Sequence, residues 1–149
     1  MDNINIALTP MPEVFGWVWK EMRTQPCFAL GILFAGDRER CVDEALTVKV
    51  DDVVVAVCTI SYRGEMDSGR PTIVGLYVTP TQRHEAIGRQ LFQRAIERMI
   101  QARNCEAIEV SVLNSKVLRM IRRLPEELQQ RLRVIDCSDS GSVDELMDR

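Results

Sequence analysis

The strongest constraint on the fold is a change of hydrophobic period in the middle of the chain. Over residues 45–79, apolar side chains alternate with polar ones or form short β-branched runs, a pattern typical of strands. After Gly88, apolar side chains instead recur every three or four positions over about four turns, which is typical of an amphipathic helix. A strand-rich block that leads directly into one long helix predicts an α+β domain.

Turn residues divide the first block into three strands. An Asp-Asp pair separates strands over residues 46–50 and 53–62, and so short a connection predicts an antiparallel hairpin. A second connection, rich in Gly, Ser and Asp, precedes a third strand over residues 72–79, which ends at Pro80. Because a glycine weakens a strand interior, Gly75 indicates either a bulge in this third strand or the close approach of another backbone.

Shorter patterns predict the remaining elements. The long helix is expected to end near Asn104, and a right-handed crossover makes the next strand parallel to the third one. The sheet is therefore expected to be mainly antiparallel, with one parallel pair. The further elements expected are strands over residues 3–9, 107–113 and 133–135, and helices over residues 12–23, 27–34 and 125–132 and after Asn114.

Length and composition limit the class of protein. A chain of 149 residues can bury a real core, so we expect one domain over residues 1–135 and an acidic tail over residues 136–149. The longest apolar stretch, residues 28–36, is far shorter than the ~20 residues that span a bilayer, and the first residues do not resemble a signal peptide. We therefore expect no membrane association and a cytoplasmic location.

Cysteine and histidine usage excludes two further classes. The five cysteines stand far apart and form neither a disulfide framework nor a CxxC pattern. Reduced thiols in the cytoplasm are the simplest account of them. No metal site is expected, because the chain offers too few ligands at suitable spacing.

The net charge of −3 conceals three differently charged segments. Residues 1–81 carry a net −4, residues 82–133 a net +5 and residues 134–149 a net −4. The basic segment fits either a pair of helices with solvated Arg-rich faces or a site for an anionic ligand. Nucleic-acid binding is disfavoured, because the aromatic residues do not alternate with the arginines.

The loop between Pro80 and the long helix has features of a phosphate site. A helix start leaves several backbone N–H groups without partners, and these groups and the helix dipole attract phosphate. The small residues Ala86 and Gly88 would let the backbone approach a pyrophosphate closely. Arg83 and Arg89 flank the loop and could pair with phosphate oxygens. A tight turn that happens to hold arginines is the alternative.

The run LYVTPTQRHEAIGRQLFQRAI resembles the acetyl-coenzyme A motif of the GNAT superfamily of acetyltransferases. In that motif a strand leads into (Q/R)-x-x-G-x-(G/A), which corresponds here to residues 83–88. The sequence departs from the motif by having Ala86 where the family usually has glycine, and alanine resists a left-handed backbone. The order of expected strands and helices also agrees with the family.

The resemblance implies a GNAT-like fold and acetyl-CoA as cosubstrate. It assigns the pantetheine arm to main-chain groups of the third strand and the pyrophosphate to the loop that follows. Asn114 would face the coenzyme arm, although an ordinary helix cap explains it equally well. The coenzyme-binding residues so implied are Leu76, Tyr77, Val78, Arg83, His84, Glu85, Ala86, Ile87, Gly88, Arg89 and Asn114.

Two catalytic positions of the family do not match. Thr72 stands where the family commonly has a Glu base, and Ile121 stands where it commonly has a Tyr acid. Glu109 and Ser111, on the neighbouring strand, are the substitute candidates. The expected activity is transfer of an acetyl group from acetyl-CoA to an amine by direct attack. The alternative is a non-catalytic GNAT-fold protein that binds acyl-CoA or a protein partner.

Two expectations concern other surfaces. The aromatic residues Phe15, Trp17 and Trp19 are expected in the core, with a place beside the acceptor as the alternative. The first strand, if it lies at a sheet edge, could pair with the same strand of a second copy, so a homodimer is conceivable.

Overall fold

The computed structural model describes residues 4–24, 42–64, 68–82, 86–112 and 115–136. The helix expected over residues 27–34 and nearly all of the expected acidic tail lie outside these ranges. In chain order the elements are β1 (Ile4–Leu8), α1 (Met11–Thr24), β2 (Glu44–Val50), β3 (Val53–Ser61), β4 (Thr72–Val78), the 3-10 turn η3 (Pro80–Gln82), α3 (Ile87–Arg103), β5 (Ile108–Val112), α4 (Ser115–Arg122), α5 (Glu126–Gln129) and β6 (Leu132–Asp136).

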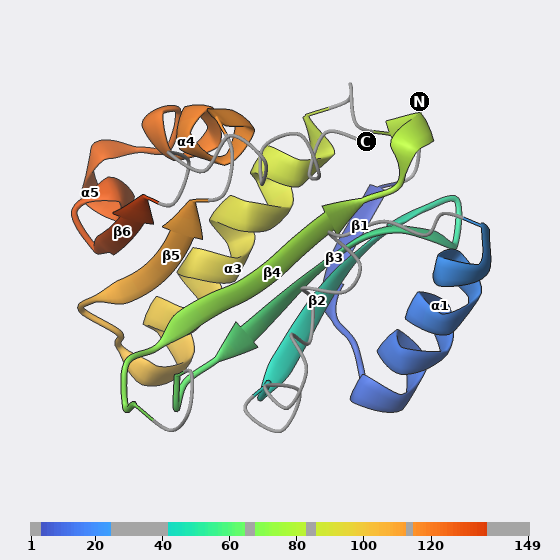
Figure 1. Ribbon diagram of the computed structural model, residues 1–149, viewed down its shortest axis with the longest axis horizontal. Helices are drawn as coiled ribbons and strands as arrows, with labels where there is room; N and C mark the ends of the chain where they lie inside the picture. The colour runs from blue at the N-terminus through green and yellow to red at the C-terminus, as the bar shows by residue number, and fades with distance from the viewer. Residues whose placement is uncertain (1–3, 25–41, 65–67, 83–85, 113–114, 137–149) are drawn as a thin grey trace.

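The strands form one six-stranded sheet in the order of the chain, β1 to β6 (Figure 1). The first four strands are antiparallel neighbours, as their patterns predict. Both β4–β5 and β5–β6 are parallel, so the expectation of one parallel pair is wrong. The chain crosses over twice, through α3 and then through α4 and α5, and each crossover returns it in the same direction. The α+β fold class itself is confirmed.

The long helix α3 covers one face of the sheet. Its apolar row is fully buried against alternate residues of the strands, among them Val48, Cys58 and Ile60. The helical row consists of Leu91, Phe92, Ala95, Ile96 and Met99. The helix ends at Asn104, whose left-handed backbone (φ 49°) and N–H bond to the Ile100 carbonyl confirm the expected stop.

Helix α1 covers the opposite face, where Val14 and Val18 pack against the sheet. Residues one step further along the helix are rotated toward solvent, so Phe15 is 39% and Trp19 67% exposed. The expected core position of these two aromatics is therefore wrong. Trp17 is half-buried, and its ring centroid lies 5.9 Å from that of Tyr77.

The first strand lies at the sheet edge and pairs only with β2 among the described strands. Ile4 and Leu8 on this strand are each 45% exposed. Pairing with a second copy stays a prediction. In the described part of the chain, no helix combines the length and apolarity needed to cross a bilayer.

A polar network fastens the second half of α3 to β2. Arg98 donates two hydrogen bonds to the Glu44 carboxylate, with Nη2–Oε2 at 2.6 Å and Nε–Oε1 at 3.2 Å. The Tyr62 hydroxyl donates to the same Oε1 at 2.6 Å, and the Arg103 guanidinium lies 4.5 Å from the centre of the Tyr62 ring. The hydrogen bond from Arg98 is the main reason that the pKa of Glu44 is lowered.

We predict that Glu44→Gln flattens the acid side of the stability profile. A carboxylate whose pKa is lowered on folding stabilises the native state above its unfolded pKa and loses this contribution as the pH falls through the folded value. Urea unfolding at steps from about pH 6 to pH 3 should therefore show a steeper loss in the native protein than in the variant.

The control is Glu97→Gln, which makes the same charge change on the exposed side of α3. Its profile should follow that of the native protein. Parallel acid profiles for the native protein and Glu44→Gln would show that the network does not stabilise the fold through this charge.

Candidate active site

Strands β4 and β5 pair only at the start of β4. Thr72 pairs with Glu109 and Ile73 with Val110, and no pair follows further along the two strands. At the same point the ladder between β3 and β4 shifts, since Thr59 pairs with Gly75 but Ile60 pairs with Ile73. Val74 is thus the extra residue of a bulge beside Gly75, which confirms the predicted bulge. The bulge bends β4 where it parts from β5.

Beyond the bulge, the main-chain N–H and C=O groups of successive β4 residues point alternately toward β3 and toward β5. The Thr79 N–H donates to the Val55 carbonyl at 2.8 Å, so the main-chain groups of Thr79 point toward β3. Because these groups alternate in an antiparallel pair, the main-chain groups of Tyr77 point toward β3, and those of Leu76 and Val78 point toward β5. The opening between β4 and β5 is therefore bordered by backbone polar groups.

The start of α3 exposes further backbone donors. Ala86 precedes the helix with a left-handed backbone (φ 59°) and makes no side-chain cap. The first intrahelical bond joins the Gln90 N–H to the Ala86 carbonyl at 3.2 Å. The N–H groups of Ile87, Gly88 and Arg89 precede it, so the helix itself supplies no acceptor for them. With the helix dipole, they form a place for an anion.

Gly88 lets this helix start approach the sheet. A Cβ on Gly88 would lie 3.2 Å from Val78 Cγ2 of β4 and 3.8 Å from Met120 Sδ of α4. The first of these distances is tighter than ordinary contact, so even alanine would push against β4. Helix α3, strand β4 and helix α4 therefore meet at this glycine.

The structure brings together part of the predicted coenzyme set. Gly88 of α3 lies against Val78 of β4, with Leu76 on the same strand and Ile87 and Arg89 on either side of Gly88 in the chain. Four other members, Arg83, His84, Glu85 and Asn114, lie outside the described residues.

The side chain of Tyr77 points away from this opening. It is buried under α1, where its hydroxyl donates to Glu21 Oε2 at 3.0 Å. The Tyr77 side chain is therefore not available to a ligand in this opening. The motif strand does not predict the contact between Tyr77 and Glu21, but the helical spacing of residues in α1 places Glu21 toward the sheet. Glu21 follows Val14 and Val18 at helical intervals, so it falls on the buried stripe of the helix.

Glu109 lies directly beside the position where the family commonly has its base. Thr72 and Glu109 are register partners, and their side chains point to the face opposite the buried Ile73 and Val110. Arg70 Nε lies 3.1 Å from Glu109 Oε2, and the Glu109 side chain is 21% exposed. Thr72 Oγ1 donates to the Arg70 carbonyl at 2.8 Å, so it belongs to the turn. Ser111, two residues after Glu109, is exposed.

The other chemistry-bearing groups of the described chain are unsuited to catalysis. Ile121, at the usual position of the Tyr acid, is 5% exposed and lies in the core beneath the sheet. Burial raises the pKa of the Cys58 thiol to about 12 and also raises that of Cys105, so neither forms a thiolate near neutral pH. Among the residues that the structure describes, no three His, Cys, Asp or Glu side chains are grouped to hold a metal ion.

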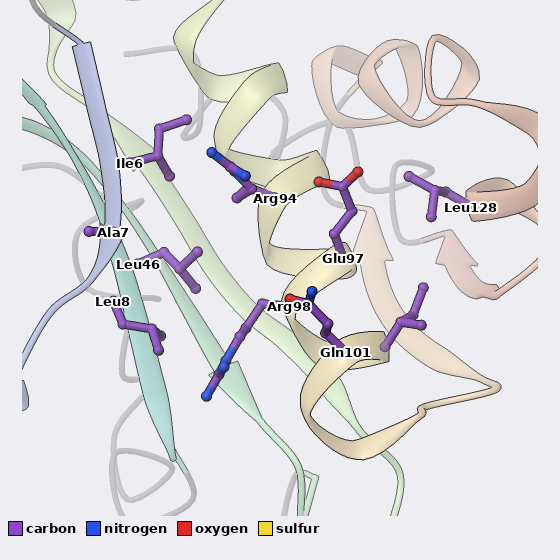
Figure 2. Close-up of a pocket in the computed structure, with 10 residues that line it drawn as sticks. Ile6, Ala7, Leu8, Leu46, Arg94, Glu97, Arg98, Gln101 and Leu128 are labelled. Atoms are coloured by element: carbon purple, nitrogen blue, oxygen red, sulfur yellow. The ribbon is translucent and has the colours of Figure 1, made fainter.

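A hollow of about 560 Å³ lies elsewhere, between β1 and the outer side of α3 (Figure 2). Figure 2 shows Ile6 and Leu8 of β1 on one side and Arg94 and Arg98 of α3 on the other. Its walls include neither the first turn of α3 nor the opening between β4 and β5. The helix start, whose first N–H groups have no acceptor within the helix, and the parting of β4 from β5 therefore lie apart from this hollow.

The comparisons with known proteins agree with this geometry. Residues 9–124 match the model of the Acetyltransferase (GNAT) family. None of the curated proteins matches the chain.

Solved structures share the fold at low identity. The aminoglycoside N-acetyltransferase AAC(6')-Iy, in complex with CoA, has a TM-score of 0.55 and 16% identity over 80% of this chain and 83% of that chain. The ribosomal-protein-alanine N-acetyltransferase from Brucella melitensis biovar Abortus 2308 has a TM-score of 0.53 and 17% identity, over 86% of each chain. A GNAT family acetyltransferase from Brucella melitensis, in complex with acetyl-CoA, has a TM-score of 0.52 and 16% identity over 68% of this chain and 71% of that chain.

The family model covers most of the chain and includes the parted strands and the first turns of α3. The solved structures share the sheet and its helices. On this evidence the chain belongs to the GNAT acetyltransferase family.

Proposed function

We propose that the protein is an N-acetyltransferase that transfers an acetyl group from acetyl-CoA to an amine. The observation that carries the proposal is the parting of β4 from β5 beside the uncapped start of α3. This arrangement offers strand-edge groups to an extended amide chain and helix N–H groups to a pyrophosphate, and acetyl-CoA contains both.

The coenzyme would lie with its arm between β4 and β5. Main-chain groups of Leu76 and Val78, which lie on the side of β4 away from β3, would bind the amides of the pantetheine arm. The pyrophosphate would accept hydrogen bonds from the N–H groups at the start of α3. The rest of its surroundings would come from residues 83–86, the Arg89 side chain and Asn114. Two of the similar structures hold CoA or acetyl-CoA, which supports the choice of ligand.

The reaction needs a base near the thioester. A neutral amine attacks the carbonyl carbon, a C–N bond forms, the C–S bond breaks, and the nitrogen loses one proton. We assign the base to Glu109, because it is the register partner of Thr72 and lies on the same face. Arg70 positions its carboxylate through the 3.1 Å ion pair. Ser111 is the second candidate, and it could relay a proton through water.

The leaving thiolate would take its proton from water. Ile121 is buried and has no proton to give. Correct placement of amine and thioester lowers the barrier substantially without a dedicated acid, because positioning alone contributes several kcal/mol, of the order of 7–11 in well-oriented model reactions.

The acceptor would be a cationic small molecule or a protein amine. The chain carries a net −3, and its acidic residues predominate outside the coenzyme segment. Two similar structures are named as acetyltransferases of aminoglycosides and of a ribosomal-protein alanine, and both kinds of acceptor carry amines.

A second candidate function is binding without catalysis. Thr72 and Ile121 replace both usual catalytic groups, and this observation favours a protein that holds acyl-CoA or a protein partner and transfers nothing. Such a protein would be stabilised by acetyl-CoA but would release no thiol in the presence of any amine.

Acetyl-CoA should stabilise the native protein, and Gly88→Glu should remove the effect. At about 100 times its Kd the coenzyme adds ~2.7 kcal/mol to the stability, which raises the Tm by several degrees. In the variant, a side chain and a negative charge enter the place of the pyrophosphate, against Val78 and Met120. Differential scanning fluorimetry and isothermal titration calorimetry measure both effects.

Gln101→Glu is the matched control, because it adds the same charge near the far end of α3. It should bind acetyl-CoA as the native protein does. If Gly88→Glu remains folded and binds with unchanged affinity, the pyrophosphate does not lie at the start of α3.

Glu109→Gln should lower kcat by about 10²-fold, the usual contribution of a general base, with a smaller change in KM. The assay is release of coenzyme A thiol with an amine found in a panel of small molecules and peptides.

Two variants separate catalysis from structure. Glu106→Gln makes the same change on an exposed residue before β5 and should keep full activity. Arg70→Gln breaks the ion pair but leaves the carboxylate, so it should reduce kcat less than Glu109→Gln does. Full activity in Glu109→Gln would exclude Glu109 as the base.

A further inference from the structure

Strand β1 forms one edge of the sheet and pairs on one side only among the described strands. The Thr9 N–H donates to the Ala45 carbonyl at 2.9 Å, so the main-chain groups of Thr9 point toward β2. Because this direction alternates along an antiparallel pair, the main-chain N–H and C=O groups of Ile4, Ile6 and Leu8 point away from β2. The outer side of β1 therefore presents a regular row of donors and acceptors.

The same three residues form an apolar stripe on the α3 side of β1. Ile6 packs against the core under α3, and side chains alternate along a strand, so Ile4 and Leu8 lie on that face as well. Ile4 and Leu8 are each 45% exposed. Figure 2 shows Ile6 and Leu8 on one wall of the hollow of about 560 Å³, with α3 as the other wall. Apolar surface thus remains uncovered beside the outward main-chain groups.

Strand β1 also lacks the features that keep edge strands from pairing. Natural edges are commonly protected by charged side chains, by proline or by a bulge. The sequence of β1, INIAL, contains no charge and no proline, and its register with β2 is continuous. Strand β6, at the other edge, carries Arg133 and Asp136. Of these two edges, β1 is the one suited to pairing with a further strand.

The charges beside β1 favour a second copy of this chain as the partner. Arg94 and Glu97 are exposed on the α3 wall of the hollow. Arg98, on the same wall, is balanced by Glu44, with Nη2–Oε2 at 2.6 Å. A partner of one charge sign would be attracted by part of this wall and repelled by another part. Across a two-fold axis, a wall of mixed sign can instead meet itself with opposite charges adjacent.

We propose that two copies of the chain pair through antiparallel β1 strands about a two-fold axis at Ile6. Ile6 then lies opposite Ile6 of the second copy, and Ile4 lies opposite Leu8. Each pair joins outward main-chain groups, which exchange hydrogen bonds, and brings two apolar side chains together on the α3 side. The two sheets become one continuous sheet. So short a strand predicts a weak dimer whose population depends on protein concentration.

The dimer would leave both coenzyme sites accessible. Strands β2 and β3 separate β1 from β4, so the opening between β4 and β5 lies across the sheet from the paired edge. The inference therefore goes beyond the proposed function and does not depend on it.

The first test is sedimentation equilibrium of the native protein from about 1 µM to about 1 mM, the range in which weak interfaces associate. The mean mass should rise from that of one copy toward that of two. Amide hydrogen exchange in the same samples should slow at Ile4, Ile6 and Leu8 as the dimer forms. Asn5 and Ala7, whose main-chain groups point toward β2, should change little.

Charges introduced at positions 4 and 8 test the register. Ile4→Lys/Leu8→Lys places like charges opposite each other and removes apolar contacts, so it should raise the dissociation constant of the dimer by about 100-fold. Ile4→Lys/Leu8→Glu makes the same two positions polar but places opposite charges across the axis. It should dimerise at least about tenfold more tightly than the first variant.

Ile135→Lys is the matched control. Ile135 is 45% exposed, as Ile4 is, but lies on β6 at the other edge of the sheet. This variant should dimerise as the native protein does. All the variants change exposed side chains, and thermal melting should show each of them folded.

Each outcome bears on the inference. A native protein that remains a single copy at about 1 mM overturns it. Equal dissociation constants for the two charge variants contradict the register with Ile6 at the axis. A dimer that forms without slower exchange at Ile4, Ile6 and Leu8, or that is lost in Ile135→Lys, assigns the contact elsewhere and also overturns it. Failure of the native protein to bind acetyl-CoA rejects the proposed function and leaves this inference standing.

Discussion

The candidate site depends on one constraint, the bulge that bends β4 away from β5. Before the bulge, β4 pairs normally with β5 at Thr72 and Ile73. After it, β3 and the buried side of α3 still hold β4, while β5 diverges. Beyond Ile73, main-chain groups of β4 on the side away from β3 no longer have β5 as their ladder partner. Backbone polar groups are costly to bury without partners. In the proposed function, an extended amide chain would lie along this side of β4 in place of β5.

The start of α3 is placed and oriented by packing. The buried apolar row and the Arg98–Glu44 pair fix the helix over the sheet, and Gly88 lets its first turn approach Val78. Ala86 adopts a left-handed backbone just before the helix, which costs an alanine about 1–2 kcal/mol relative to the right-handed form. This strain lies beside the proposed pyrophosphate site, where a ligand that needs this turn would offset it.

Much of this arrangement could be predicted from local patterns. Alternation located β2, β3 and β4 to within two residues, and Gly75 and Asn104 marked the bulge and the helix end. A strand was expected over residues 133–135, but its parallel pairing with β5 was missed, because so short a run does not indicate which strand it joins. The exposure of Trp19 and the pairing of Arg70 with Glu109 were missed because they depend on how distant elements meet. The motif pointed to the start of α3, but the choice of Glu109 as base needed the register of β4 and β5.

The central claim is that acetyl-CoA binds between β4 and β5 with its pyrophosphate at the start of α3. The most direct measurement is the change in backbone amide NMR signals when acetyl-CoA is added to the native protein. The account predicts the largest shifts at Ile87, Gly88 and Arg89, with smaller ones at Leu76 and Val78 and none at Ala7 or Gln101. Shifts gathered around the hollow between β1 and α3, with the start of α3 unchanged, would contradict it.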